Sequence, residues 1–128
     1  GFEAWPRAHR APVRAPAPPW AYARGMRDVV YEVTAEIQSG RVLDEFLAWL
    51  GQGHVQAVLD GGARHAMITV YDHEAGWSVE CRFAFSSREA YDEYDRGPAR
   101  PIREEMHRKF ERQVRFHRKV GKLAFRLP

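Results

Sequence analysis

The strongest constraint on the fold is a regular alternation of apolar and polar residues. In residues 77–85, WSVECRFAF, every second residue from Trp77 to Phe85 is apolar. Successive side chains of a β-strand point to opposite faces, so this pattern predicts a strand with one face in a core and the other outside it. Residues 28–37, DVVYEVTAEI, alternate in the same way. The chain is therefore expected to fold around a sheet that is apolar on one side only.

Apolar residues at helical spacing predict the elements that cover the apolar side. Residues 41–50, RVLDEFLAWL, place their apolar side chains on one face of a helix. Gly51 and Gly53 interrupt this pattern, and residues 54–60 resume it for one or two turns. The glycine pair at residues 61–62 then ends the helical region.

A second helical region is expected after residue 85. Ser86 and Glu89 have the spacing of a capping box that opens a helix. Residues 97–98, Gly-Pro, close the first part of this region. The helix restarts at Pro101 and then has apolar residues at every fourth position.

Two further strands complete the predicted domain, over residues 63–72 and 114–127. The order of elements is then β-α-β-β-α-β. Two helices on one face of a four-stranded antiparallel sheet in this order form a ferredoxin-like α+β domain. A chain of 128 residues is long enough for one such domain with its own core. We assign this domain to residues 26–128.

Residues 1–25 differ in composition from the rest of the chain. They hold five prolines, repeated alanines and arginines and a single acidic residue, with neither helical nor strand periodicity. One interpretation is a dispensable extension or the remnant of a processed leader. The other is an N-terminal arm that docks the domain on a larger protein assembly, anchored by Trp5, Trp20 and Tyr22, because buried aromatic rings dominate interfaces.

Several stretches, in this order, resemble a small bacterial family known as domain of unknown function 4286, which is grouped with the dimeric α/β barrels. They are VVYEVTAEI, DEFLAWLGQGHVQAVLDGG, VECRFAFSSREAYDEY, PARPIREEMHRKF and VRFHRKV. The resemblance covers roughly residues 26–120, and the N-terminal arm has no counterpart in it. It implies a ferredoxin-like fold and a homodimer in which two sheets stack through their uncovered faces. It implies no activity, although other members of the barrel class include cofactor-independent monooxygenases and haem-degrading enzymes.

The polar side of the sheet is the place where candidate functional side chains converge. It is predicted to carry Glu32, Glu36, His65, Tyr71, Glu80, Arg82, Arg115 and His117. One hypothesis is an interface in which glutamates neutralise the arginines, and the alternative is a cavity in which the cationic residues meet a small anionic or polar molecule. We favour the interface because the charges balance, whereas a catalytic set more often leaves one charge unmatched.

We find no other pattern that predicts catalysis, and we expect neither a cofactor nor a metal. The single cysteine, Cys81, excludes an intrachain disulfide, and its apolar neighbours predict an inert, buried thiol. No histidines stand at the spacing of metal ligands, and His54 at the helix break is expected to cap or to pack. No apolar run is long enough to span a membrane. We expect a cytoplasmic protein, peripheral to a larger complex if the arm docks.

The patterns favour a non-catalytic α+β module that acts as a homodimer or as an accessory subunit. The first alternative is a dimeric barrel that binds or transforms a small polar molecule without a cofactor. The second alternative is RNA binding through residues 100–126, which carry ten Lys or Arg against three Glu. We rank RNA binding last because residues 77–85 lack the glycine and the exposed stacking aromatics of an RNA-recognition motif.

Overall fold

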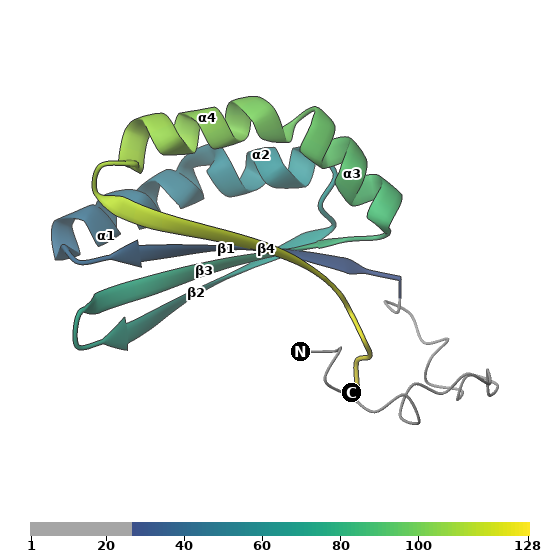
Figure 1. The fold of residues 1–128 in the computed structure, drawn as a ribbon, viewed down its shortest axis with the longest axis horizontal. Helices are drawn as coiled ribbons and strands as arrows, with labels where there is room; N and C mark the ends of the chain where they lie inside the picture. Colours follow the sequence, from purple (N-terminus) through teal and green to yellow (C-terminus); the bar gives the residue numbers. More distant parts are fainter. Residues whose placement is uncertain (1–26) are drawn as a thin grey trace, which may run out of the picture.

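The structure of the protein is a computed structural model that describes residues 27–128. In this part of the chain a four-stranded sheet forms one layer, and the helices form a second layer on one of its faces (Figure 1). The predictions for the N-terminal arm, including Trp5, Trp20 and Tyr22, lie outside the described residues. The boundary at residue 26 accordingly stays a prediction.

The sheet has the strand order β2-β3-β1-β4, and every pair of neighbours is antiparallel. Its strands are β1 (Val29–Ile37), β2 (His65–His73), β3 (Gly76–Phe85) and β4 (Val114–Lys122). Helices separate β1 from β2 and β3 from β4, which confirms the predicted ferredoxin-like α+β fold.

The alternating residues of β1 and β3 build the core. In β1 the residues at every second position from Val29 to Ile37 are at most 6% exposed, and β3 buries Val79, Cys81 and Phe83 in the same way. Directly paired residues of antiparallel strands share a face, so the two apolar rows lie side by side under the helices. This is the arrangement that the alternation predicts.

The first helical region begins with α1 (Gly40–Trp49), capped by the Ser39 hydroxyl, which accepts a hydrogen bond from the Val42 amide at 3.3 Å. A wider turn, η4 (Leu50–His54), joins it to α2 (Val55–Asp60). Gly53 in this turn has φ 143°, a conformation that residues with a side chain rarely adopt. The predicted interruption of the helix is therefore confirmed.

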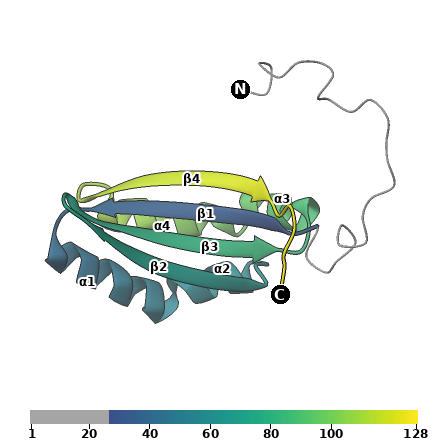
Figure 2. The same ribbon diagram turned by 90° about the horizontal axis from the view of Figure 1, so that it is seen from below.

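The second helical region contains α3 (Arg88–Arg96) and α4 (Ala99–Phe110). The sequence predicts Ser86 as the cap of this region, but the cap is Ser87. Ser87 immediately precedes the helix, and its hydroxyl accepts a hydrogen bond from the Ala90 amide at 3.0 Å. The second part begins at Ala99, before Pro101, since proline is tolerated in the first turn of a helix. Both helical regions pack on the same face of the sheet (Figure 2).

The last residues leave the sheet and cross its uncovered face. Strand β4 ends at Lys122, not at residue 127 as predicted, and the Leu123 amide donates a hydrogen bond to the Asp28 carbonyl at 2.9 Å. The Arg126 guanidinium lies 3.9 Å from the Asp28 carboxylate. Figures 1 and 2 show this tail on the side of the sheet away from the helices, passing the ends of β1 and β3. No helix among residues 27–128 combines the length and the apolar character needed to cross a membrane.

Candidate functional site

Strand pairing places all eight predicted side chains on the side of the sheet that faces away from the helices, which we call the open face. Paired residues point to the same side, and Glu32 of β1 pairs with Arg82 of β3 and with Lys119 of β4. The predicted residues on the open face are Glu32, Glu36, His65, Tyr71, Glu80, Arg82, Arg115 and His117.

Glu32 lies near the middle of the open face and is a largely buried charged group. Its side chain is 8% exposed, and its carboxylate accepts hydrogen bonds from Arg82 Nε at 3.2 Å and from Arg82 Nη2 at 3.1 Å. Lys119 Nζ stands 3.7 Å from the other carboxylate oxygen. The two cations are far more exposed than the carboxylate between them. A carboxylate with so little exposure can remain ionised because both of its oxygens have cationic partners.

Glu36, at the far end of β1, takes part in a smaller network. The Ser78 hydroxyl lies 2.9 Å from both of its carboxylate oxygens, and His73 Nε2 lies 3.6 Å from one of them. His73 also contacts the Ser78 hydroxyl at 3.0 Å. His73 is not among the predicted residues because the predicted strand ends at residue 72, although continued alternation from Tyr71 places it on this face.

The rest of the open face carries groups that the protomer leaves unmatched. Within residues 27–128, Glu80 and Arg115 form no ion pair and His117 forms no side-chain hydrogen bond. Along β2, Met67 and Tyr71 are 59% and 50% exposed. The face therefore holds charges of both signs and large apolar side chains, and only some of its charges have a partner within the chain.

Cys81 is buried, as its apolar neighbours predict, and His54 is half-buried. Burial and the neighbouring Glu32 charge raise the pKa of the Cys81 thiol to about 12, which keeps it protonated and unreactive. The His54 ring stacks on Trp49 with centroids 4.1 Å apart, so it packs and does not cap. Burial lowers the pKa of His54 to about 4, against a smaller opposing effect of Glu105. Among the described residues no cluster of three or more His, Cys, Asp or Glu could hold a metal ion.

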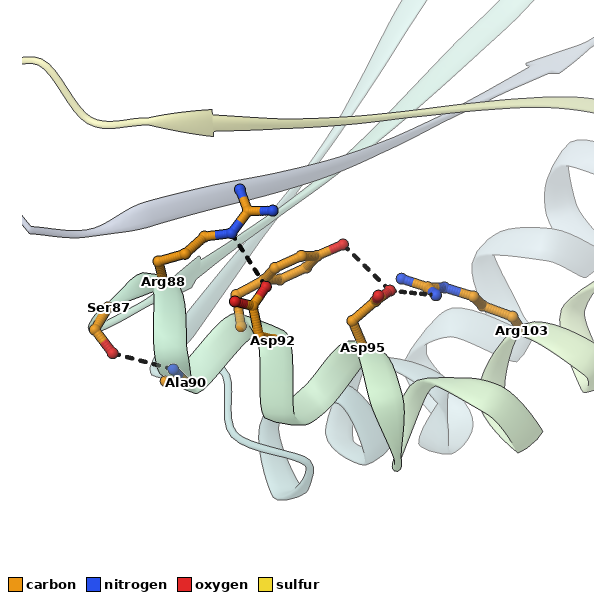
Figure 3. Close-up of polar contacts among 7 residues, drawn as sticks. Ser87, Arg88, Ala90, Asp92, Asp95 and Arg103 are labelled. Carbon is orange, nitrogen blue, oxygen red and sulfur yellow. Dashed lines mark hydrogen bonds and ion pairs between the residues drawn. The ribbon is translucent and has the colours of Figure 1, made fainter.

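A second polar cluster, which the sequence patterns do not predict, lies on the helix side of the sheet. Arg103 of α4 donates to Asp95 of α3 at 2.6 Å and to the Tyr31 hydroxyl at 3.4 Å. Its guanidinium carbon lies 5.4 Å from the centre of the Tyr31 ring and 6.0 Å from that of Tyr94. The Tyr91 hydroxyl donates to Asp95 at 3.5 Å, so that carboxylate lies between a phenol and a guanidinium (Figure 3). We call these five residues the Arg103 cluster.

The charged groups of the Arg103 cluster stabilise each other's ionised forms. The hydrogen bond from Arg103 keeps the pKa of Asp95 below its usual range. Burial opposes the charge of Arg103, but its hydrogen bonds to Tyr31 and Asp95 outweigh burial and raise its pKa. The signal in the sequence was the set of three tyrosines on core positions, because a buried phenol needs a hydrogen-bond partner.

The sequence of the domain matches a known family. The model of the family described as "Domain of unknown function (DUF4286)" matches residues 28–122. The chain belongs to the DUF4286 family. The match covers every strand and helix of the ferredoxin-like domain, in agreement with the resemblance seen in the sequence. No curated protein matches the chain.

Solved structures share the fold of this DUF4286 chain at low sequence identity. A dimeric ferredoxin-like protein from an uncultured marine organism has 13% identity and a TM-score of 0.62, with 79% of this chain and 98% of the other covered. SnoaB, a cofactor-independent oxygenase from Streptomyces nogalater, has 10% identity and a TM-score of 0.60, with 80% and 98% covered. A putative antibiotic biosynthesis monooxygenase from Bacillus cereus has 13% identity and a TM-score of 0.56, with the same coverage. At such identities the likeness establishes the fold alone.

Proposed function

We propose that this DUF4286 protein is a non-catalytic module that forms a homodimer by stacking the open faces of two sheets. The observation that carries the proposal is the pair of unmatched opposite charges, Glu80 and Arg115, on a face that also exposes Met67 and Tyr71. One unmatched charge would favour a catalytic site, but these two charges have opposite signs. A two-fold interface brings one surface against a copy of itself, so a face with both signs of charge can neutralise itself.

The size of the open face is consistent with a stable dimer. Four strands about 4.8 Å apart and about 30 Å long span roughly 600 Å² in projection. Standard interfaces bury about 800 Å² of accessible surface per partner, and the relief of the side chains adds to the projected area. Two solved structures with this fold are described as dimeric ferredoxin-like proteins, which also supports this mode of assembly.

In the same proposal, the N-terminal arm acts as a tether. Trp5, Trp20 and Tyr22 would dock the dimer on a larger assembly, for which we expect a cytoplasmic location, the usual setting of an unpaired cysteine such as Cys81. Replacing Trp5 and Trp20 with Ala in the full chain should then reduce the mass of the native complex to that of the dimer. An unchanged mass would argue against the tether.

The first alternative is a ligand held between the sheets. The names of SnoaB, an oxygenase, and of the Bacillus cereus protein, a monooxygenase, favour it. On the open face, however, the largely buried Glu32 is already paired with two cations. RNA binding has less support because the basic residues of β4 alternate between the two faces. Lys119 lies on the open face, whereas Arg118 lies on the helix side.

The test is a single substitution at the centre of the open face. Thr34 is half-buried on β1 and pairs with Glu80. Thr34→Arg therefore adds a long cationic side chain next to the Glu80 carboxylate of the same chain. We expect the wild-type chain to have twice the mass of 14.8 kDa in solution and Thr34→Arg to have the mass of one chain, with unchanged circular dichroism. The matched control is Ala48→Arg, which adds the same side chain at an exposed position of α1.

Two results would overturn the proposal. A monomeric wild-type chain at micromolar concentration would exclude the homodimer. A Thr34→Arg variant that remains dimeric would show that the interface lies elsewhere. A dimer that binds a small molecule only when Glu32 and Arg82 are intact would support the first alternative.

A further inference from the structure

The open face has a hollow at the end of the sheet that the C-terminal tail crosses. At this end Val30 of β1 pairs with Ala84 of β3 and, on its other side, with Gly121 of β4. Paired residues share a face, so two small residues flank Val30 there. The next row along the strands contains the long side chains of Glu32 and Arg82. The surface of the sheet is therefore low beside this charged pair.

The sheet and the tail line the hollow from different sides. Its volume is about 340 Å³, within the range of small-molecule pockets, roughly 300–1,000 Å³. Val30, Met67 and Ala84 line it from the sheet, and Leu123 lines it from the tail. Figure 2 shows the tail crossing this end of the strands. Burial of an apolar group in such surroundings is favourable.

A nearly buried carboxylate also lines the hollow. The side chain of Asp28 is 6% exposed, and its only ion pair among residues 27–128 is with Arg126 at 3.9 Å, a separation too long for a hydrogen bond. In this part of the chain the one fully shielded side-chain atom without a hydrogen-bond partner is Arg103 Nη2, so the Asp28 oxygens are accessible. Buried carboxylates are rarely left without hydrogen bonds. Asp28 can therefore accept hydrogen bonds from a molecule in the hollow.

The other charged groups around the hollow have partners or can move. Arg82 donates two hydrogen bonds to Glu32. Arg126 is 56% exposed and belongs to the segment after Lys122, which forms neither helix nor strand. With His65 counted as neutral, two carboxylates and two guanidinium groups line the hollow, so their charges cancel. Because the group without a hydrogen bond is an acceptor, a ligand of this hollow must supply donors.

We propose that the hollow under the C-terminal tail binds a small organic cation with an apolar body. Its N–H groups donate to the Asp28 carboxylate, as planar cationic groups with paired donors do, and its body lies over Val30 and Ala84. The cation takes the position that Arg126 occupies next to Asp28. One protomer supplies the whole site, so the inference goes beyond the proposed dimer, and the monomeric Thr34→Arg variant should retain the site.

The experiment is a titration of the full chain with benzamidine, followed by the amide shifts of residues 28–32 and 121–124 in NMR spectra. Three probes are titrated in parallel: benzyl alcohol has a ring without the charge, guanidinium has the charge without the ring, and benzoate has the opposite charge. We expect saturable shifts with benzamidine and much weaker effects of the other three.

Two variants test the role of the carboxylate. Asp28→Asn keeps the shape of the side chain and should weaken benzamidine binding at least about tenfold, as expected for the loss of a charge-assisted hydrogen bond. Arg126→Gln removes the competing cation and should strengthen binding up to about fivefold, the range of an exposed ion pair. The matched control is Glu36→Gln, which removes the same charge at the other end of the open face of β1 and should leave binding unchanged.

Several results would overturn the proposal. They are the absence of a saturable shift with benzamidine, equally tight binding of any other probe, and a Glu36→Gln variant that binds as weakly as Asp28→Asn. Binding that Arg126→Gln does not strengthen would contradict it too, and this variant keeps the test valid if Asp28→Asn is unstable, because Arg126 is largely exposed. Loss of binding in Thr34→Arg would place the site between two protomers, whereas failure of the chain to dimerise leaves the benzamidine result unaffected.

Discussion

The pairing of Glu32 and Arg82 gives a quantitative prediction for the open face. In Arg82→Ala the Glu32 carboxylate loses two hydrogen bonds and keeps only Lys119 at 3.7 Å. Breaking a fully buried ion pair destabilises a protein by about 3–5 kcal/mol, and an exposed pair contributes at most about 1 kcal/mol. Here the carboxylate is 8% exposed and the guanidinium 52% exposed. We therefore expect Arg82→Ala to lower the free energy of unfolding by about 1–2 kcal/mol.

A double-mutant cycle isolates the pair. Glu32→Gln, Arg82→Ala and the double variant are unfolded with urea at pH 7 and at one fixed protein concentration, since dimerisation would add to the stability. We expect a coupling energy of about 1 kcal/mol that decreases between 0.1 M and 1 M salt, because Arg82 is solvated. Arg112→Ala, which removes an exposed arginine without an ion pair among the described residues, should change the stability by less than about 0.5 kcal/mol.

The result that would refute this reasoning is a cycle without coupling. If Arg82→Ala has the same effect with Glu32 as with Gln at that position, the two hydrogen bonds do not hold the carboxylate in place. Glu32 would then be stabilised by Lys119 or by a partner outside residues 27–128.

Three further predictions concern single residues. Burial lowers the pKa of His54 in the folded chain to about 4, so between pH 6.5 and pH 4 only the unfolded chain takes up this proton. The free energy of unfolding should therefore decrease as the pH falls through this window, by at most about 1.4 kcal/mol per pH unit. The urea midpoint of His54→Phe should depend less on pH than that of the wild-type chain. Gly53→Ala and Gly76→Ala both place a side chain on a residue with φ near 140°, which strains the backbone. At Gly76 the new methyl group also overlaps the Ile37 carbonyl oxygen, so Gly76→Ala should destabilise the fold by at least about 1 kcal/mol more than Gly53→Ala. Equal urea midpoints of the two variants would contradict this. Cys81, which is 3% exposed, should react with a thiol reagent at pH 8 only after unfolding, and rapid labelling of the native protein would show that it is accessible.

The strands and their faces could be predicted from the sequence because alternation with period two depends on little else than burial. The cap was misplaced because Ser86 and Ser87 are chemically equivalent, and only the end of β3 at Phe85 and the start of α3 at Arg88 decide between them. The end of β4 was missed for a related reason. Apolar residues continue to alternate after Lys122, but Lys122 already pairs with Val29, the first residue of β1, and no partner strand remains.

The Arg103 cluster could not be predicted from periodicity. An arginine on a helix with many charged neighbours usually lies in water, and nothing in the local pattern distinguishes Arg103 from Arg100 or Arg108. Its burial depends on Tyr31, which is 72 residues away in the chain. The charged pairs of the open face were easier to predict because a sheet aligns them by register.

The C-terminal tail has a consequence for how two sheets could approach each other. Because Leu123 and Arg126 fasten it to Asp28, one end of the open face carries an extra layer of polypeptide, while the end near Glu36 and Tyr71 is bare. Two copies stacked on this face would be in contact at the bare ends, and each tail would keep the two sheets apart where it lies between them. In the proposed dimer the tail would thereby set the angle between the sheets as well as their area of contact.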